Sequence, residues 1–521
     1  MTIELASYLS GEWVRGSGKG AELVDPSTEA VLATVSTEGL DLAKALSFAR
    51  DHGGKNLRAM TFASRGEILR KLSKAIYEKR DELIGLAIAN GGNTRSDAKF
   101  DIDGATGTLA YYADLGKELG DTHVLADGDA VQLGRSARLF GAHVYTTRRG
   151  VAVHVNAFNF PAWGLAEKAA VALLAGMPVL CKPATSTGLV AHRIAEIMVA
   201  TDALPIGAFS LLAGSVGSLT SHLEPQDVLA FTGGSSTGKT LRALEAVVGR
   251  AVRLNVEADS LNAAVLGPDV EIGSDLENLF TADVTRDIQQ KTGQKCTAIR
   301  RVYVPRERLG EIADLLAERL RGIKVGVPSR DDVTMGPLST KNQLRDVRGG
   351  ARKIAACSKL VYGDIDKVTV LGRDEGDKGF FVSPLLFVND SPSADDVIHT
   401  HEVFGPCATV MPYDGTGEDA ARLVAAGGGG LVTSVYSDDA KFQSSAILGI
   451  APFHGRITLG TSKVASQAVP PGTVMPQLIH GGPGRAGGGE ELGGRRGLAF
   501  YMQRTALQGD RAVLETLTGK R

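Results

Sequence analysis

The pattern of apolar and polar positions changes partway along the chain. Between residues 61 and 89, apolar residues recur every three or four positions with charges between them, which is typical of scaffold helices. The first part of the chain therefore reads mainly as helix. From about residue 150, short apolar runs alternate with helical patterns. Because strands separated by helices form parallel sheets covered on both faces, the sequence predicts a doubly wound, Rossmann-like α/β fold. Ligands of such sheets bind beyond the carboxyl ends of the strands.

The individual segments of this region can be assigned from the same pattern. The predicted strands are 151–157, 177–181, 209–212, 228–231 and 251–256, and the predicted helices are 162–175, 189–201 and 237–248. A second α/β block follows over about 259–460, with a helix near 307–321 and a strand at 430–436. The segments 121–147 and 463 onward read as strands and loops that extend from the two blocks.

Size and charge restrict the classes of function. A chain of 521 residues with 43% hydrophobic content exceeds what one core usually supports, so we expect two or three domains. The net charge of -2 gives no field that would attract nucleic acid or an anionic membrane, so a small ligand is expected. No basic start precedes an apolar core, and no run approaches the roughly 20 apolar residues that span a bilayer. We therefore expect a soluble, cytoplasmic protein.

Cysteine and glycine usage adds two expectations. The cysteines at 181, 296, 357 and 407 show neither Cys-x-x-Cys pairing nor metal-ligand spacing, so neither a disulfide scaffold nor a metal site is predicted. Many of the 64 glycines fall late in the chain, at 427–430 and 481–494. We interpret these stretches as loops, because glycine loses much backbone entropy on ordering and packs no side chain.

Two residues carry candidate chemistry. Cys296 follows the small turn 293–295, and Glu257 ends an apolar run. A thiol can attack a carbonyl carbon, and a nearby carboxylate can then activate water against the resulting thioester. The alternative is that Cys296 is a buried inert cysteine and Glu257 a solvated strand end.

A second motif suggests a different function. Residues 233–240, Gly-Gly-Ser-Ser-Thr-Gly-Lys-Thr, match the phosphate loop of P-loop NTPases and lie between a strand and a helix. The sequence shows no convincing second strand that ends in a magnesium-binding aspartate. The NTPase is therefore kept as the alternative, and a non-catalytic scaffold as a third hypothesis. Whichever class of protein this is, the glycines of residues 233–240 and the helix N-terminus that follows suit a phosphate.

Several motifs in one order resemble the aldehyde dehydrogenase superfamily over nearly the whole chain. They are Asn159-Phe160-Pro161, Lys182-Pro183-Ala184, Phe231-Thr232-Gly233 with Gly238, Glu257, residues 293–296 and residues 402–406. The resemblance implies domains at 1–120 with 148–258 (dinucleotide binding) and 259–462 (catalytic), and oligomerisation strands with a C-terminal loop at 121–147 and 463–521. A homo-oligomer is implied, with a dimer favoured.

The resemblance also implies roles for individual residues. Cys296 is the nucleophile, Glu257 the general base, and Asn159 the side-chain half of the oxyanion hole. Lys168 matches a lysine behind the active site, and Glu167 beside it is read as a proton relay or cofactor gate, with a surface carboxylate as the alternative. The implied cofactor-binding residues are Lys182, Thr185, Phe231, Gly233, Gly238, Glu402 and Phe404.

The cofactor can be argued at Lys182 and Thr185. Relatives that prefer NAD often have a glutamate three residues after this lysine, which repels a 2′-phosphate. Thr185 does not repel phosphate and could donate to it, so we predict NADP. The alternative is that the Thr185 hydroxyl caps the following helix.

Departures from the family pattern suggest a divergent subgroup. Ala258-Asp259 replaces the usual glycine pair, and the interval from base to nucleophile is longer than usual. With the late segment 480–490, these features are similar to aldehyde dehydrogenases of aerobic aromatic degradation through coenzyme A thioesters. That similarity implies an aldehyde substrate, in particular a semialdehyde linked to coenzyme A. Glu490 or Glu491 could line the substrate mouth, or could simply be solvated.

Overall fold

The computed structural model describes residues 3–373 and 378–518 and contains two seven-stranded sheets. The first sheet has the order β12-β11-β8-β9-β10-β2-β3. Its strands are β2 (Ser7–Leu9), β3 (Glu12–Val14), β8 (Ala152–Val155), β9 (Val179–Lys182), β10 (Phe209–Leu211), β11 (Val228–Thr232) and β12 (Arg253–Glu257). The five strands from β8 to β12 are parallel, as predicted. Their order reverses between β8 and β11, which is the position where doubly wound sheets bind ligands.

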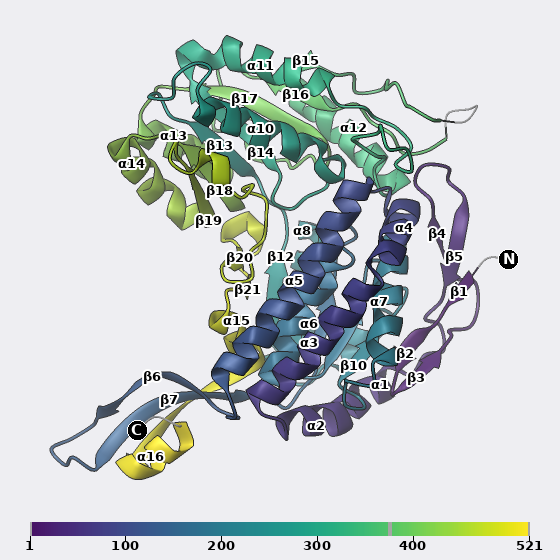
Figure 1. The fold of residues 1–521 in the computed structure, drawn as a ribbon, viewed down its shortest axis with the longest axis vertical. Helices are drawn as coiled ribbons and strands as arrows, with labels where there is room; N and C mark the ends of the chain where they lie inside the picture. The colour runs from purple at the N-terminus through teal and green to yellow at the C-terminus, as the bar shows by residue number, and fades with distance from the viewer. Residues whose placement is uncertain (1–2, 374–377, 519–521) are drawn as a thin grey trace.

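Helices cover both faces of this sheet (Figure 1). They are α1 (Leu42–Phe48), α2 (Gly54–Arg58), α3 (Phe62–Glu78), α4 (Arg80–Gly91), α5 (Arg95–Leu119), α6 (Trp163–Ala175), α7 (Gly188–Ala200), α8 (Ser235–Arg242) and α9 (Glu245–Val248). Helix α6 is apolar on almost every side and is almost fully buried against α3 and α5. The helix predicted at 237–248 is in fact two helices, since the chain is extended at Leu244.

The chain also begins with strands that the sequence pattern did not predict. Besides β2 and β3, a three-stranded sheet contains β1 (Ile3–Leu5), β5 (Val31–Val35) and β4 (Ala21–Val24). The prediction that the first part is mainly helical therefore holds only from residue 42 onward. These strands are three to five residues long, which is too short for a clear alternating pattern.

The second sheet has the order β15-β16-β17-β14-β13-β18-β19. Its strands are β13 (Asn262–Leu266), β14 (Ile299–Pro305), β15 (Lys359–Tyr362), β16 (Leu385–Val388), β17 (Cys407–Tyr413), β18 (Gly430–Tyr436) and β19 (His454–Gly460). Helices α10 (Asp275–Gln289), α11 (Leu309–Arg321), α12 (Lys341–Ala355), α13 (Gly417–Ala425) and α14 (Ala440–Ile450) surround it. All neighbouring strands are parallel except the edge strand β15.

The two sheets meet end to end. Strand β12 ends at Glu257, and after the four residues 258–261 the chain enters β13 of the second sheet. The carboxyl ends of the first sheet's parallel strands therefore face the amino ends of the second sheet's strands. Side chains on the loops at both edges converge in the space between the sheets.

A three-stranded antiparallel sheet extends away from the body of the molecule (Figure 1). It consists of β6 (Leu125–Gln132), β7 (Leu139–Thr147) and β22 (Met502–Asp510), and α16 (Arg511–Thr518) packs against it. Within the described parts of the chain, no helix combines the length and apolar character needed to cross a bilayer.

The late glycine-rich segment is only partly a loop. It contains β20 (Ile479–Gly481) and β21 (Glu490–Leu492), which pair as an antiparallel hairpin before α15 (Arg495–Tyr501). Gly487 has φ +108°, and a Cβ there would lie 2.1 Å from the Val256 carbonyl oxygen. The missing side chain allows this segment to pack directly on β12, a close approach that composition alone does not reveal.

A buried ion pair fixes the start of the central strands. The Asp227 carboxylate accepts hydrogen bonds from the Arg50 guanidinium at 2.6 and 3.1 Å and from the backbone N–H groups of Val151 and Glu224, both at 2.7 Å. We expect Asp227→Ala to lower the free energy of unfolding by about 2–3 kcal/mol, because it leaves two backbone N–H groups without their acceptor and, among the described residues, the Arg50 guanidinium with only Glu224 and the His222 carbonyl oxygen. Urea denaturation measures the loss.

The control is Asp114→Ala, which removes the partner of Arg70 in an exposed ion pair. Exposed pairs contribute little, so this variant should lose less than about 1 kcal/mol. Equal losses in the two variants would contradict the structural role of Asp227.

Candidate active site

The segment before Cys296 has an unusual backbone. Lys291, Thr292 and Gly293 all have positive φ, at 52°, 55° and 66°. A Cβ on Gly293 would lie 2.2 Å from the Gly405 carbonyl oxygen. Left-handed geometry at two non-glycine residues costs conformational energy, and the surrounding contacts must offset this cost. The strained turn places the Cys296 thiol between the two sheets.

Arg300 on β14 holds this turn in place. Its buried guanidinium donates to the carbonyl oxygens of Gly293 at 2.8 Å, Lys295 at 3.2 Å and Gly405 at 2.7 Å. The ammonium of Lys295 is itself buried and paired with Asp287 at 2.6 Å. The turn before Cys296 is therefore tied to the loop around Gly405 and to α10.

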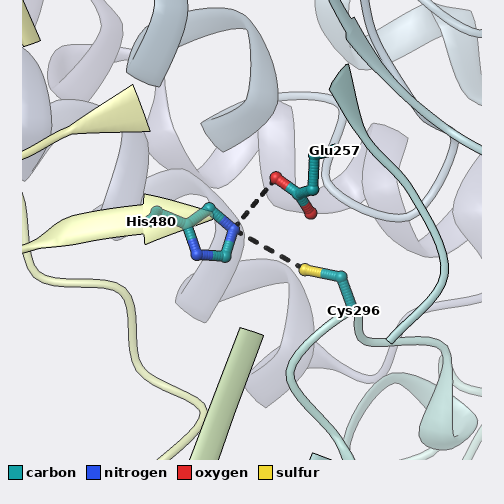
Figure 2. A group of neighbouring side chains, drawn as sticks. All are labelled: Glu257, Cys296 and His480. Carbon is teal, nitrogen blue, oxygen red and sulfur yellow. Dashed lines mark hydrogen bonds and ion pairs between the residues drawn. The ribbon is translucent and has the colours of Figure 1, made fainter. Parts of the chain in front are cut away.

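Three side chains from distant parts of the sequence meet at the thiol (Figure 2). His480 Nε2 lies 3.2 Å from Glu257 Oε2 and 3.8 Å from Cys296 Sγ. The side chains of Glu257 and His480 are only 2% and 4% exposed, whereas Cys296 is half-buried. The structure thus brings Glu257 and Cys296 together despite the changed residues 258–259 and the longer interval. The alternative that Glu257 is a solvated strand end is wrong.

Burial and charge act on all three groups. Burial raises the pKa of the Cys296 thiol well above its ordinary value, and the carboxylates of Glu257 and Glu167 raise it further. Burial alone would also raise the pKa of Glu257, but His480 as a cation and Lys168 hold it below its usual range. Burial would lower the pKa of His480, but Glu257 outweighs it and raises that pKa. Glu257 therefore stabilises the protonated form of His480, which makes this imidazole a stronger base than an ordinary histidine.

A second group of buried charges lies on the other side of Glu257. Lys168 Nζ is 2.9 Å from Glu167 and 3.0 Å from Glu491, and all three side chains are at most 10% exposed. Burial alone would lower the pKa of Lys168, but the two carboxylates raise it well above its ordinary value. Burial raises the pKa of Glu491 to about 7. Glu167 is thus not a surface carboxylate, and Glu491 lies behind the site, whereas Glu490 is exposed.

Asn159 lies on the turn between β8 and α6, and its amide points toward the nucleophile turn. Asn159 Nδ2 donates to the Gln294 carbonyl oxygen at 3.0 Å. Asp101 of α5 fixes this region, because its carboxylate accepts from the backbone N–H groups of Ala162 and Trp163 at 3.3 and 2.8 Å. Since an amide nitrogen carries two hydrogens, one remains for a substrate oxygen.

Two cavities meet at these residues. One is a small pocket with an apolar wall formed by Phe100, Phe160, Trp163 and Val474, and with polar and charged side chains on the side of Cys296. The other is a larger groove between the two sheets. Both are lined by Asn156, Ala157, Asn159, Thr232, Glu257 and Cys296. The thiol is therefore accessible from the pocket on one side and from the groove on the other.

The groove contains most of the predicted cofactor residues. Those that line it are Lys182, Thr185, Phe231, Gly233, Glu402 and Phe404. Gly238 does not line it: a Cβ there would lie 3.1 Å from a Val256 methyl, so this glycine allows α8 to pack on β12. Thr185 Oγ1 donates to the Gly214 carbonyl oxygen at 3.1 Å, and Thr187 is the N-cap of α7. The alternative that Thr185 caps the following helix is wrong.

The polar groups of the groove suit a dinucleotide. Helix α8 begins there after Gly234, and no side chain caps its first N–H groups, which suits a phosphate. Glu402 Oε1 and Thr232 Oγ1 are buried without a hydrogen-bond partner among the described residues. Burial raises the pKa of Glu402 to about 7, with Arg300 opposing the shift. Such unsatisfied acceptors suit the hydroxyl groups of a ribose.

The P-loop alternative does not agree with this geometry. Lys239 is exposed on α8 and does not line the groove, although Gly233, Gly234 and Thr237 do. A P-loop lysine must reach the bound phosphates. The glycines of this motif therefore lie at the groove without the lysine that defines an NTPase.

Two sets of side chains have donor atoms close enough to hold a metal ion. They are Glu257 with Cys296 and His480, and Glu167 with Glu257 and Glu491. In each set a basic side chain already contacts a carboxylate: His480 contacts Glu257 in the first, and Lys168 contacts Glu167 and Glu491 in the second. We assign no metal to either.

Sequence reasoning missed His480 and Arg300. His480 is 184 residues from Cys296 and 223 from Glu257, so their proximity depends on the hairpin that packs on β12. The available signal was a histidine that opens the glycine-rich run at 480–489. Arg300 was overlooked because it stands in a short apolar strand, where a charged residue indicates buried hydrogen-bond acceptors.

Comparisons with known proteins agree with this architecture. The fold matches the NAD⁺ complex of an aldehyde dehydrogenase from Bacillus cereus with a TM-score of 0.82 at 22% identity, covering 98% of this chain and 97% of that one. The family model "Aldehyde dehydrogenase family" matches residues 13–507. The chain therefore belongs to the aldehyde dehydrogenase family and is an oxidoreductase that oxidises aldehydes with NAD(P).

Two curated relatives are similar over nearly their full length. The chain is 42% identical to 3,4-dehydroadipyl-CoA semialdehyde dehydrogenase of Aromatoleum evansii, over 92% of this chain and 93% of that protein. It is 26% identical to alpha-ketoglutaric semialdehyde dehydrogenase of Bacillus subtilis, over 89% and 91%.

The strained turn before the thiol leads to a prediction. We expect Gly293→Ala to reduce turnover by about 100-fold, because the methyl group collides with the Gly405 carbonyl and displaces Cys296. Steady-state kinetics measures the effect, with circular dichroism to establish that the variant is folded. The control Gly310→Ala adds a methyl group to open space on α11 and should retain activity. Normal turnover in Gly293→Ala would show that the turn geometry is unimportant.

Proposed function

We propose that this protein oxidises an aldehyde to a carboxylic acid through a covalent thioester on Cys296, with NADP as the cofactor. The observation that carries the proposal is the junction of the two cavities at Cys296, Glu257 and Asn159. A substrate in the small pocket and a dinucleotide in the groove would both reach the thiol there. The scaffold hypothesis gives no reason for this convergence.

For the substrate, we propose 3,4-dehydroadipyl-CoA semialdehyde, oxidised to 3,4-dehydroadipyl-CoA in the degradation of aromatic compounds. The 42% identity to the Aromatoleum evansii enzyme supports this choice. So does the apolar wall formed by Phe100, Phe160, Trp163 and Val474, which suits the carbon chain that leads to the aldehyde group.

The reaction starts with the thiolate of Cys296, which attacks the aldehyde carbon and leaves a negative charge on the oxygen. The free hydrogen of the Asn159 amide, with the Cys296 backbone N–H, stabilises that oxygen; one such donor typically lowers the barrier by about 2.7–4 kcal/mol. A bound nicotinamide would accept the hydride that the former aldehyde carbon loses as the adduct becomes the thioester. Lys182, Thr185, Phe231, Gly233, Glu402 and Phe404 would hold the dinucleotide.

The second half of the reaction is hydrolysis. The thioester carbon is accessible to water beside Glu257, whose carboxylate accepts a proton from that water. The acyl group leaves as a carboxylate, and the thiol is restored. A carboxylate at this position favours hydrolysis over transfer of the acyl group to a second thiol. Lys168, Glu167 and Glu491 form a buried group of charges beside Glu257. This group offers a route by which protons leave Glu257.

We also propose that the protein forms a homodimer through its extension. The sheet of β6, β7 and β22 stands apart from the body (Figure 1). Val131 and Leu139 on its strands and Leu133 in the connection between β6 and β7 are exposed, as are Val513 and Leu517 on α16. A second copy related by two-fold symmetry would cover them.

Glu257→Gln tests the order of the chemical steps. We expect this variant to produce about one equivalent of reduced cofactor per active site and then to stop, because the thioester forms but its hydrolysis lacks a base. Stopped-flow absorbance of the reduced nicotinamide measures the burst, and Cys296→Ala should give none. Lys239→Ala should turn over normally. Sustained turnover in Glu257→Gln would exclude this carboxylate as the base.

A kinetic comparison tests substrate and cofactor together. We expect kcat/KM to be higher for the CoA-linked semialdehyde than for free medium-chain aldehydes, and higher with NADP than with NAD. Thr185→Glu should lower kcat/KM for NADP by about tenfold or more, because its carboxylate repels the 2′-phosphate, and should spare NAD. Ser186→Glu, which adds the same charge at a residue that does not line the groove, is the control. An unchanged NADP preference in Thr185→Glu would contradict the assignment.

A further inference from the structure

We propose that His480 is the acid–base partner of Cys296: its imidazole takes the thiol proton and then lies, as a cation, between the thiolate and the Glu257 carboxylate. The proposal rests on the function proposed above. It adds to that site a residue that the motif comparison did not assign.

The geometry places one ring nitrogen next to both groups. His480 Nε2 is 3.8 Å from Cys296 Sγ and 3.2 Å from Glu257 Oε2 (Figure 2). A contact of 3.8 Å is within the range for hydrogen bonds to sulfur, which is larger than oxygen. In a hydrolase triad the histidine uses its two nitrogens for two partners, whereas here a single N–H serves the thiolate and the carboxylate in turn.

The hairpin holds the ring in this position. His480 pairs directly with Glu491 across the β20–β21 ladder, and neighbouring positions of an antiparallel pair project from the same face. Glu491 in turn bonds Lys168 and the Asn255 amide of β12, the latter at 3.1 Å. The hairpin is thus anchored on the strand that carries Glu257, and the imidazole is 96% buried beside the thiol.

The electrostatic surroundings create the need for such a partner. Carboxylates face Cys296 from three elements: Glu257 at the end of β12, Glu167 on α6 and Glu402 before β17. Each opposes the formation of a thiolate, and burial raises the pKa of the thiol further. Water at neutral pH would deprotonate this thiol only rarely. A neighbouring base accepts the thiol proton, and the cation that it becomes offsets the repulsion between the thiolate and the carboxylates.

Among the described residues, none of the other cations around the site donates a hydrogen bond to the sulfur. Lys168 on α6 pairs with two carboxylates, and Arg300 on β14 donates to three backbone carbonyls. Arg456 on β19 donates to a carbonyl oxygen at 2.8 Å; its Nη1 has no hydrogen-bond partner in the described parts of the chain, and its charge acts on Cys296 only through space. His480 directly contacts the sulfur, and its imidazole can gain and lose a proton.

The proton balance is closed within the three residues. The forward step starts from the neutral imidazole with its lone pair at Nε2: the S–H bond of Cys296 breaks and an N–H bond forms at that nitrogen, so the net charge of the three side chains stays the same. The cation that forms is the one that the Glu257 carboxylate stabilises. The thiolate then attacks the aldehyde carbon. When the thioester is later hydrolysed, the C–S bond breaks, and the same N–H returns its proton to the leaving sulfur. His480 thus acts as a base in the first half and as an acid in the second.

The experiment measures the reactivity of the thiol without any aldehyde. The rate at which iodoacetamide alkylates Cys296 follows the thiolate fraction. The measurement uses the full-length protein carrying Cys357→Ser, which removes the other partly exposed thiol. In this background we compare the parent with His480→Gln, Glu257→Gln and the double variant. Mass spectrometry identifies the modified cysteine.

We expect His480→Gln to slow alkylation at neutral pH by about tenfold or more, because Glu257 then faces the thiolate without compensation. Glu257→Gln should react at least as fast as the parent. In the double variant the carboxylate is also absent, so alkylation should return to within about threefold of the parent. A residue that only supports the fold would give no such recovery.

The outcomes separate this proposal from its alternatives. Unchanged alkylation in His480→Gln, or a double variant as slow as His480→Gln, would overturn it. If His480→Gln misfolds, the same comparison is made with His480→Asn. The control is His192→Gln, which removes a buried histidine on α7 that bonds a backbone carbonyl and so reports the cost of losing such a ring. Aldehyde turnover is measured separately. Slow alkylation with no oxidation of any aldehyde in the parent would refute the proposed function but keep His480 as the partner of the thiol.

Discussion

The site depends on one buried guanidinium. Arg300 binds the carbonyl oxygens of the turn before Cys296 and of Gly405, and it lies 3.9 Å from Glu402. Taking a guanidinium out of water is costly, and several acceptors at once are needed to offset that cost. In return, the nucleophile turn and the loop that carries Glu402 and Phe404 become a single unit. The thiol and this wall of the groove therefore cannot move independently.

The buried charges around Glu257 are retained for chemistry more than for stability. Lys168, Glu167, Glu491 and His480 lie between sheets and helices that would pack at least as well with apolar side chains. Buried ion pairs gain little or nothing over such packing. They do keep a carboxylate ionised and hold an ammonium and an imidazole beside it. Glycines in the segment after His480 make the arrangement possible by letting its backbone approach β12.

The sequence predicted the parallel sheet of the first block and strand β18 at its exact bounds, because these depend on local patterns. The resemblance to the aldehyde dehydrogenase superfamily predicted the motifs that line the groove. It missed what depends on contacts between distant segments. The proximity of His480 to Cys296 follows from strand pairing, and the partner of the Thr185 hydroxyl is a carbonyl oxygen 29 residues away. The N-terminal strands are too short to show a clear alternation of apolar and polar residues. Gly238 matched the motif, but its spacing could not distinguish helix packing from contact with a ligand.

The meeting of the two sheets explains why the chemistry occurs where it does. Asn159, Thr232 and Glu257 follow or end strands of the first sheet, at and beside the point where its strand order reverses. Cys296 and Glu402 precede β14 and β17, so they come from the amino ends of the second sheet. A doubly wound sheet alone offers a binding crevice at its carboxyl edge. Because the second sheet faces that crevice with its opposite edge, the base and the nucleophile approach from opposite sides: Glu257 ends β12, and Cys296 stands on the turn that leads into β14. The distance between them is therefore set by how the two sheets pack.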